Sequence, residues 1–136
     1  MIVALLAVAL TMTAPAAPSS RVDARLVRID GKRMELVVRN RTDQRIAYFQ
    51  FYLRRSGYAV RGARALSPGH CSYVYYVLCA PRSNIRPGGT FRAVVSLSRK
   101  YPARAGAVLY AAVPPSPGDD EGELLGPFSV VGPAPR

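Results

Sequence analysis

The chain has 136 residues, of which 49% are apolar and 20% are charged. This length allows one domain with one core, and the composition excludes a chain that is disordered throughout. Nineteen Lys and Arg against eight Asp and Glu leave a formal net charge of +11, which favours anionic polymers or membrane surfaces as partners. Since 17 of the 19 basic residues are Arg, a solvated basic surface that reflects codon composition is the alternative.

The first residues predict a cleavable signal segment over residues 1–17 and therefore a secreted or cell-envelope location. An unbroken apolar run covers residues 1–10, and Ala14-Pro15-Ala16 places small residues where a signal peptidase reads them. The run is shorter than the roughly 20 apolar residues that span a bilayer, so no transmembrane span is expected after cleavage. Because no Lys or Arg precedes the run, an N-terminal strand or helix buried in the domain is the alternative.

Alternation of apolar and polar residues dominates residues 18–131 and predicts β-strands separated by turns, with no convincing helix. In the first expected strand, Val22, Ala24 and Leu26 alternate with polar neighbours. Asp30-Gly31 then supplies a hairpin turn, and the alternation resumes on the return strand over residues 34–38.

The strand expected over residues 46–54 has two different faces. Phe49, Phe51 and Leu53 lie on one face, which we predict to point into the core. The opposite face carries polar and aromatic side chains, namely Tyr48, Gln50, Tyr52 and Arg54.

The pattern of the second half is weaker at first and then clear. Residues 55–69 predict a short edge strand plus a loop, and the segment Cys71–Cys79, rich in Tyr and Val, predicts a strand or a tight hairpin. After a turn at Arg86-Pro87-Gly88, the segment Phe91–Leu97 is the clearest strand of the chain. The remaining expected segments are strands over 107–113 and 124–131, an acidic loop over 114–122 and a C-terminal tail over 132–136.

Cys71 and Cys79 are the two cysteines of the chain, and two thiols in an exported chain of this size are normally paired. We therefore predict a disulfide that closes a short loop and stabilises the fold by about 2 to 3 kcal/mol in the chain-entropy treatment. A metal site is not expected, because a site of this kind needs more Cys or His than the pair and the single histidine, His70.

Several of these motifs follow one another in a familiar order: Asn40-Arg41-Thr42 at a strand end, the cysteine pair, the turn Ile85–Thr90 before a Val-rich strand, and Ala105-Gly106 before a late strand. In this order the chain resembles the immunoglobulin-like repeat domains of secreted bacterial surface proteins, the conserved-repeat type of unknown function. The resemblance implies a single immunoglobulin-like β-sandwich over residues 18–131, with about seven to eight short antiparallel strands. It also implies that the cysteines form a local disulfide.

The sequence offers no catalytic constellation. One histidine, no free thiol after pairing and half of the acids in one late loop leave few combinations of acid, base and nucleophile. We therefore expect a protein that is not an enzyme and holds no cofactor. The loop Asp119–Glu123 contains a cluster of carboxylates but lacks the alternating ligands of a calcium loop. A solvated loop is therefore the favoured interpretation. Asn40-Arg41-Thr42 fits the N-glycosylation acceptor pattern, which matters only in a eukaryotic secretory pathway.

Tyrosine and arginine residues together suggest a binding surface. The predicted anionic-ligand face consists of Tyr52, Arg54, Arg55, Tyr73 and Tyr75, whose rings and guanidinium groups can contact a glycan or an anionic polymer. Since tyrosine is favoured on strands in any case, the alternative is that these residues are ordinary outward positions of a sheet.

Two hypotheses for the function remain. In the first, the chain is an exported non-enzymatic module with a structural or interaction role at the cell envelope, bound to a protein or polymer that the sequence does not name. In the second, it is an electrostatic binder of anionic envelope polymers, glycans or phospholipid surfaces through its Arg/Tyr-rich face. Nucleic acid is disfavoured as a partner, because export removes most opportunity to meet it.

Overall fold

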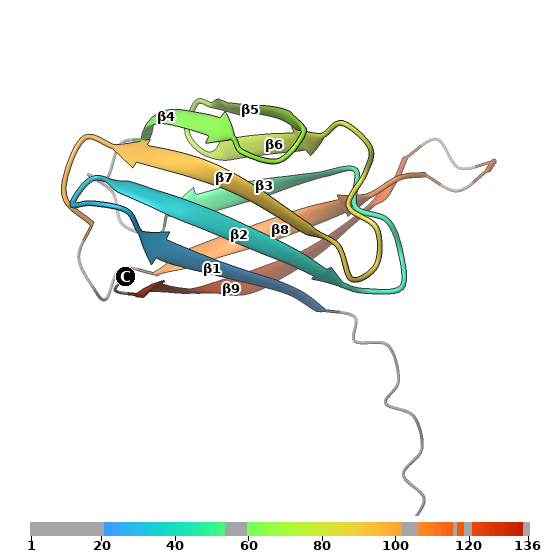
Figure 1. Ribbon diagram of the computed structural model, residues 1–136. Helices are drawn as coiled ribbons and strands as arrows, with labels where there is room; N and C mark the ends of the chain where they lie inside the picture. The colour runs from blue at the N-terminus through green and yellow to red at the C-terminus, as the bar shows by residue number, and fades with distance from the viewer. Residues whose placement is uncertain (1–20, 54–59, 102–105, 116, 119–120, 135–136) are drawn as a thin grey trace, which may run out of the picture.

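The computed structural model describes residues 21–53, 60–101, 106–115, 117–118 and 121–134 (Figure 1). The predicted signal segment, Arg54, Arg55 and the pair Asp119-Asp120 lie outside the described residues. Within those ranges, no helix is long and apolar enough to cross a membrane.

The described residues form nine β-strands, which together make one mixed sheet. The strands are β1 (Arg21–Arg28), β2 (Arg33–Arg41), β3 (Tyr48–Leu53), β4 (Val60–Ala65), β5 (Gly69–Tyr73), β6 (Val77–Pro81), β7 (Thr90–Leu97), β8 (Ala107–Val113) and β9 (Glu123–Ala134). Their order in the sheet is β4-β7-β2-β1-β9-β8-β3-β6-β5.

The sheet bends back on itself into two facing layers and nearly closes a barrel (Figure 1). One layer consists of β4, β7, β2 and β1, and the other of β8, β3, β6 and β5. β9 joins the two layers, because Val130 pairs with Ala24 of β1 in parallel and Phe128 pairs with Leu109 of β8 in antiparallel orientation. Gly126 lies in the irregular stretch of β9 with a φ of +122°, where a Cβ would come within 2.8 Å of the Leu109 carbonyl oxygen. Only glycine fits there without a shift of the backbone.

The all-β prediction is confirmed, whereas the immunoglobulin-like sandwich of seven to eight antiparallel strands is not. The described residues contain nine strands, and the β1–β9 pair is parallel. The segment from Cys71 to Cys79, predicted as a strand or a tight hairpin, belongs to the β5–β6 hairpin and so contributes to two strands. β9 also continues to Ala134, which pairs with Val27, so residues 132–134 of the expected tail belong to the sheet.

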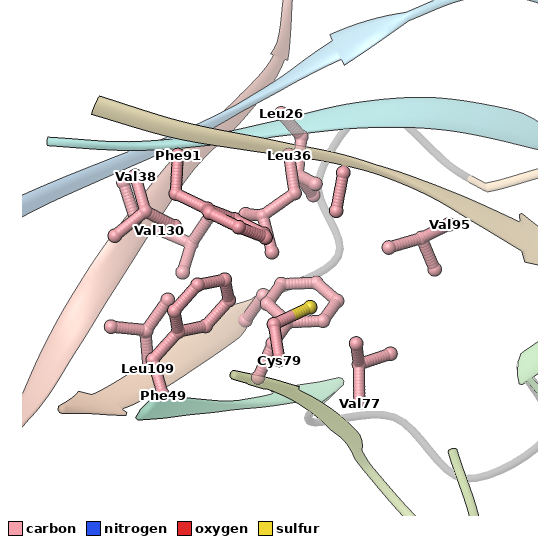
Figure 2. Close-up of a cluster of buried hydrophobic side chains, with 14 of the residues drawn as sticks. Leu26, Leu36, Val38, Phe49, Val77, Cys79, Phe91, Val95, Leu109 and Val130 are labelled. Atoms are coloured by element: carbon pink, nitrogen blue, oxygen red, sulfur yellow. The ribbon is translucent and has the colours of Figure 1, made fainter. Parts of the chain in front are cut away.

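The core lies between the two layers and is built by the inward positions of the alternating strands (Figure 2). Phe49 of β3 meets Phe91 of β7 across the interior, with ring centroids 5.6 Å apart and planes at 72°, the edge-to-face geometry that aromatic pairs prefer. Leu36 and Val38 of β2 point toward Leu109 of β8 in the same cluster. The predicted inward positions of the first two strands and of the strand at 91–97 are all buried.

Asn40, at the end of β2, is a fully buried polar residue whose hydrogen bonds tie loops to the strand end. Its Nδ2 donates to the carbonyl oxygens of Gln44 and Ile85 at 2.7 and 2.8 Å. Its Oδ1 accepts from the backbone N–H and the hydroxyl of Thr42 at 2.9 and 2.6 Å. Because the amide is buried and uses both its nitrogen and its oxygen inside the fold, the Asn-Arg-Thr pattern has a structural role here.

The predicted disulfide between Cys71 and Cys79 is present. The two residues lie directly opposite each other on β5 and β6, with their Cα atoms 4.1 Å apart. The bond therefore closes the β5–β6 hairpin covalently near its turn.

Candidate functional site

The structure places the predicted Tyr/Arg face in more than one location. Tyr52 is half-buried on the outer side of β3, and its ring stacks on Tyr76 with centroids 4.8 Å apart. Tyr73 lies in register with Val77 and Phe51, which are buried in the core, so it is on the opposite side of the sheet from Tyr52. Tyr75 is in the β5–β6 turn and is 92% exposed. Among the predicted residues that the structure describes, the tyrosines do not form one surface.

Tyr52 instead belongs to a cluster of three tyrosines. Its ring meets Tyr110 of β8 edge-on at 5.8 Å in addition to the stacked Tyr76, and its hydroxyl donates to Oε1 of Gln50 at 3.2 Å. Burial raises the pKa of the Tyr52 hydroxyl, and the neighbouring Tyr76 and Tyr110 raise it further. The cluster borders a groove of about 370 Å³ whose lining includes Val108 and carries no charged group.

A larger groove lies on the outer face of the other layer, across β1, β2, β7 and the end of β9. It has a volume of about 760 Å³. Five arginines line it: Arg21 and Arg25 of β1, Arg39 and Arg41 of β2, and Arg92 of β7. We call it the arginine groove.

Strand register explains how these arginines come together. Arg25 of β1 and Arg92 of β7 both pair with Val37 of β2, so they flank this valine from its two sides. Val37 is an outward position, yet only 7% of it is exposed. Long arginine side chains cover apolar surface with their methylene stems while the guanidinium groups stay in water. The arginine groove therefore has an apolar floor beneath a cationic rim.

Two acids neutralise part of this rim. Asp23 forms ion pairs with Arg21, at 3.0 Å, and with Arg41 on the neighbouring strand. Glu35 contacts Arg92 at a longer 3.4 Å. Arg25 and Arg39 are exposed and make no ion pair with any acid in the described part of the chain. These two guanidinium groups are the ones available to an incoming anion.

The distribution of charge separates the two layers. β1, β2, β4 and β7 together carry nine arginines and two acids. β3, β5, β6 and β8 carry no Lys, Arg, Asp or Glu at all. A codon bias toward arginine would act on the outward positions of both layers alike, and this asymmetry is not what such a bias produces.

Sequence reasoning did not single out the arginine groove, although Arg25 and Arg92 sit at outward positions of predicted strands. Arg25 lies between the inward Ala24 and Leu26, and Arg92 lies between the inward Phe91 and Ala93. The alternation could have marked these arginines as outward. What it could not provide is the strand order that places β2 between β1 and β7.

The described residues include side chains of the types that bind metal ions, among them the single histidine. They contain no group of three or more His, Cys, Asp or Glu side chains that could hold a metal. His70 is exposed on the edge strand β5, away from the acids of β1 and β2.

Comparison with known proteins adds little to this geometry. No family model matches the chain, and no curated protein matches it. Two solved structures are similar to it, both of the GH20 exo-β-N-acetylglucosaminidase from Vibrio harveyi: the complex with N-acetylglucosamine and an inactive mutant. The complex is 15% identical with a TM-score of 0.49, covering 85% of this chain and 19% of that chain. The mutant is 14% identical with a TM-score of 0.47, covering 81% and 17%. The chain thus spans less than a fifth of that enzyme, and similarities this distant support no statement about activity.

Proposed function

We propose that this chain is a non-enzymatic interaction module of the cell envelope that binds an anionic polymer in the arginine groove. The observation that carries the proposal is the segregation of arginine to one layer, where Arg25 and Arg39 have no acidic partner among the described residues. The disulfide supports an extracytoplasmic location, because such bonds persist in oxidising compartments.

The geometry of the arginine groove suits a polyanion with repeated phosphate, sulfate or carboxylate groups. A guanidinium group binds such oxyanions with two parallel hydrogen bonds. Neighbouring strands are about 4.8 Å apart, so arginines on β1, β2 and β7 present several cations across one short surface. The methylene stems of the arginines that cover Val37 let the less polar part of the polymer backbone lie against protein without burying an unpaired charge.

The test is the affinity of the protein for long-chain polyphosphate and for dextran sulfate as a function of salt. We expect binding that weakens steeply as the salt concentration rises, because neutralised phosphates release counterions. The double variant Arg25→Gln, Arg39→Gln should bind more weakly. Its slope of log K against log salt should be smaller by roughly 0.7 to 0.9 per lost contact, the value known for nucleic acid polyanions.

The matched control is Arg82→Gln, Arg86→Gln, which removes the same charge from two exposed arginines outside the arginine groove. This variant should lose only the small effect of a lower net charge. Equal losses in the two double variants would mean that net charge alone drives the binding, and retention that is insensitive to salt would contradict the electrostatic mechanism.

A further inference from the structure

The turn of the β5–β6 hairpin exposes apolar side chains where turns normally carry polar ones. Val74 is 76% exposed and Tyr75 is 92% exposed, and the adjacent Tyr73 is 43% exposed. Gly, Asn, Asp, Ser and Pro dominate turns because of their backbone and hydrogen-bonding properties. We call residues 73–75 the hairpin tip. Its composition is typical of a surface that meets a partner.

The hairpin tip is held in place from both sides. Below it, Cys71 is bonded to Cys79, and the backbone N–H of Val74 donates to the Tyr76 carbonyl at 3.1 Å. Tyr76 turns its ring onto Tyr52, which anchors the far side of the turn to β3. Val74 and Tyr75 therefore project from a preorganised base, and little conformational entropy is lost when they are buried by a partner.

Basic residues lie at the same end of the molecule as the hairpin tip. β6 begins beside the end of β3, and the end of β3 pairs with the start of β8. The start of β8 pairs with the second half of β9, whose last residues pair with the end of β1. The hairpin tip and the β1–β2 turn are thus at one end of the two layers. At the β1–β2 turn, the backbone N–H of Leu97 donates to the Lys32 carbonyl at 2.8 Å, which places the exposed Arg99 and Lys100 nearby.

The acid at this end is already occupied. Asp30 accepts hydrogen bonds from the backbone N–H groups of Lys32 and Arg33 at 2.9 Å, and its other oxygen pairs with Arg33 Nε at 2.7 Å. Lys32, Arg99 and Lys100 form no ion pair with an acid in the ranges that the structure covers. This end of the molecule therefore combines an exposed apolar tip with unneutralised cations.

We propose that the hairpin tip docks on an anionic phospholipid bilayer, with Val74 and Tyr75 inserted among the head groups and Lys32, Arg99 and Lys100 over the phosphates. Tyrosine suits the interface because its ring is apolar and its hydroxyl stays hydrated. Each basic residue near an anionic membrane surface adds to the attraction. The complementary charge favours this occupant over a neutral apolar partner. This surface is distinct from the arginine groove, which lies on the outer face of β1, β2 and β7.

The chain contains no tryptophan, so Tyr75→Trp introduces a single reporter at the hairpin tip. The probe is a vesicle of equal parts phosphatidylglycerol and phosphatidylcholine. We expect the emission of this variant to shift to the blue on vesicle binding and to be quenched by brominated acyl chains. The matched reporter is Tyr48→Trp at the start of β3, a 39% exposed position at the opposite end of the strand from the hairpin turn, which should show neither change.

If the protein binds the vesicles but both reporters stay in water, docking runs through another surface and the proposal is wrong. The proposal is also wrong if the protein does not bind the vesicles at all. Either result leaves polyphosphate binding by the arginine groove untouched, so the two proposals fail separately.

A loss-of-function pair sharpens the distinction. Val74→Ser with Tyr75→Ser should lower partition into these vesicles roughly tenfold, as expected when two apolar side chains are removed from an interface, and should leave polyphosphate affinity unchanged. For the variant Arg25→Gln with Arg39→Gln, the loss of polyphosphate affinity should be larger than the loss of partition into the vesicles. Thermal unfolding by circular dichroism checks that each variant is folded. Unchanged partition of the serine variant into the vesicles would overturn the membrane assignment. It would also be overturned if the serine variant loses self-association and not vesicle binding.

Discussion

The two layers of the sheet differ in how their outer faces meet the surroundings. The layer of β1, β2, β4 and β7 covers its outward valines with arginine side chains, so that Val37 is almost as buried as a core residue. The layer of β3, β5, β6 and β8 has no charged residue and covers its outer face with stacked tyrosines. The same chain therefore presents a cationic face and a neutral aromatic one, and its net charge of +11 describes neither of them.

The largest loss of stability is expected from a substitution in the core between the two layers. Phe49→Ala removes the ring that meets Phe91 across the core, and such truncations lower the free energy of unfolding by about 3 to 5 kcal/mol. Because one core joins the layers, unfolding should remain a single transition by circular dichroism and by tyrosine fluorescence. Phe49→Leu is the milder control. Two separate transitions would show that the two layers unfold as independent units.

A smaller effect is expected from a change confined to the uncharged layer. Replacing both Cys71 and Cys79 with alanine should lower the free energy of unfolding by about 2 to 3 kcal/mol, because the hairpin is no longer closed in the unfolded chain. Urea denaturation measures this loss, and polyphosphate affinity should be unchanged because the arginine groove lies on the other layer. A loss of polyphosphate binding in the folded variant would show that the two faces are coupled.

The smallest change in stability is expected from a substitution in the β1–β2 turn of the charged layer. Backbone hydrogen bonds from Lys32, followed by the contacts with Arg33, lower the pKa of Asp30 from 3.8 to about 2. A carboxyl with a lowered pKa stabilises the folded state above its unfolded pKa, and this contribution is lost as the pH falls from 3.8 toward 2.

Asp30→Asn should therefore unfold at a lower temperature than the wild type at neutral pH, with the gap narrowing as the pH falls through this window. Thermal midpoints measured at a series of pH values give the comparison. Asp43→Asn, at an exposed acid with no ion pair to a described residue, is the control. A gap that stays constant down to pH 2 would contradict the role assigned to the Asp30 carboxylate.

Local pattern predicted much of this fold, because the properties it depends on are local. Alternation identified Val22, Leu36 and Phe91 as inward residues, and all three are buried. The disulfide was predicted because two thiols in an exported chain of this size are normally paired, and the bond is present.

The features that sequence reasoning missed depend on which strands become neighbours. Val130 pairs with Ala24 in parallel, and nothing in either segment alone reports this partner. The arginine groove has the same origin, since Arg25 and Arg92 are brought together only by the intervening Val37. The burial of Asn40 likewise depends on the distant Ile85 carbonyl.

The position of β9 has a consequence for how the protein is made. β9 fills the gap between β1 and β8, and its residues 123–134 are synthesised after those of both neighbours. Until then, the facing edges of β1 and β8 have unpaired backbone groups that can template pairing with other chains. The sheet is therefore completed through contacts of long sequence separation, which form slowly.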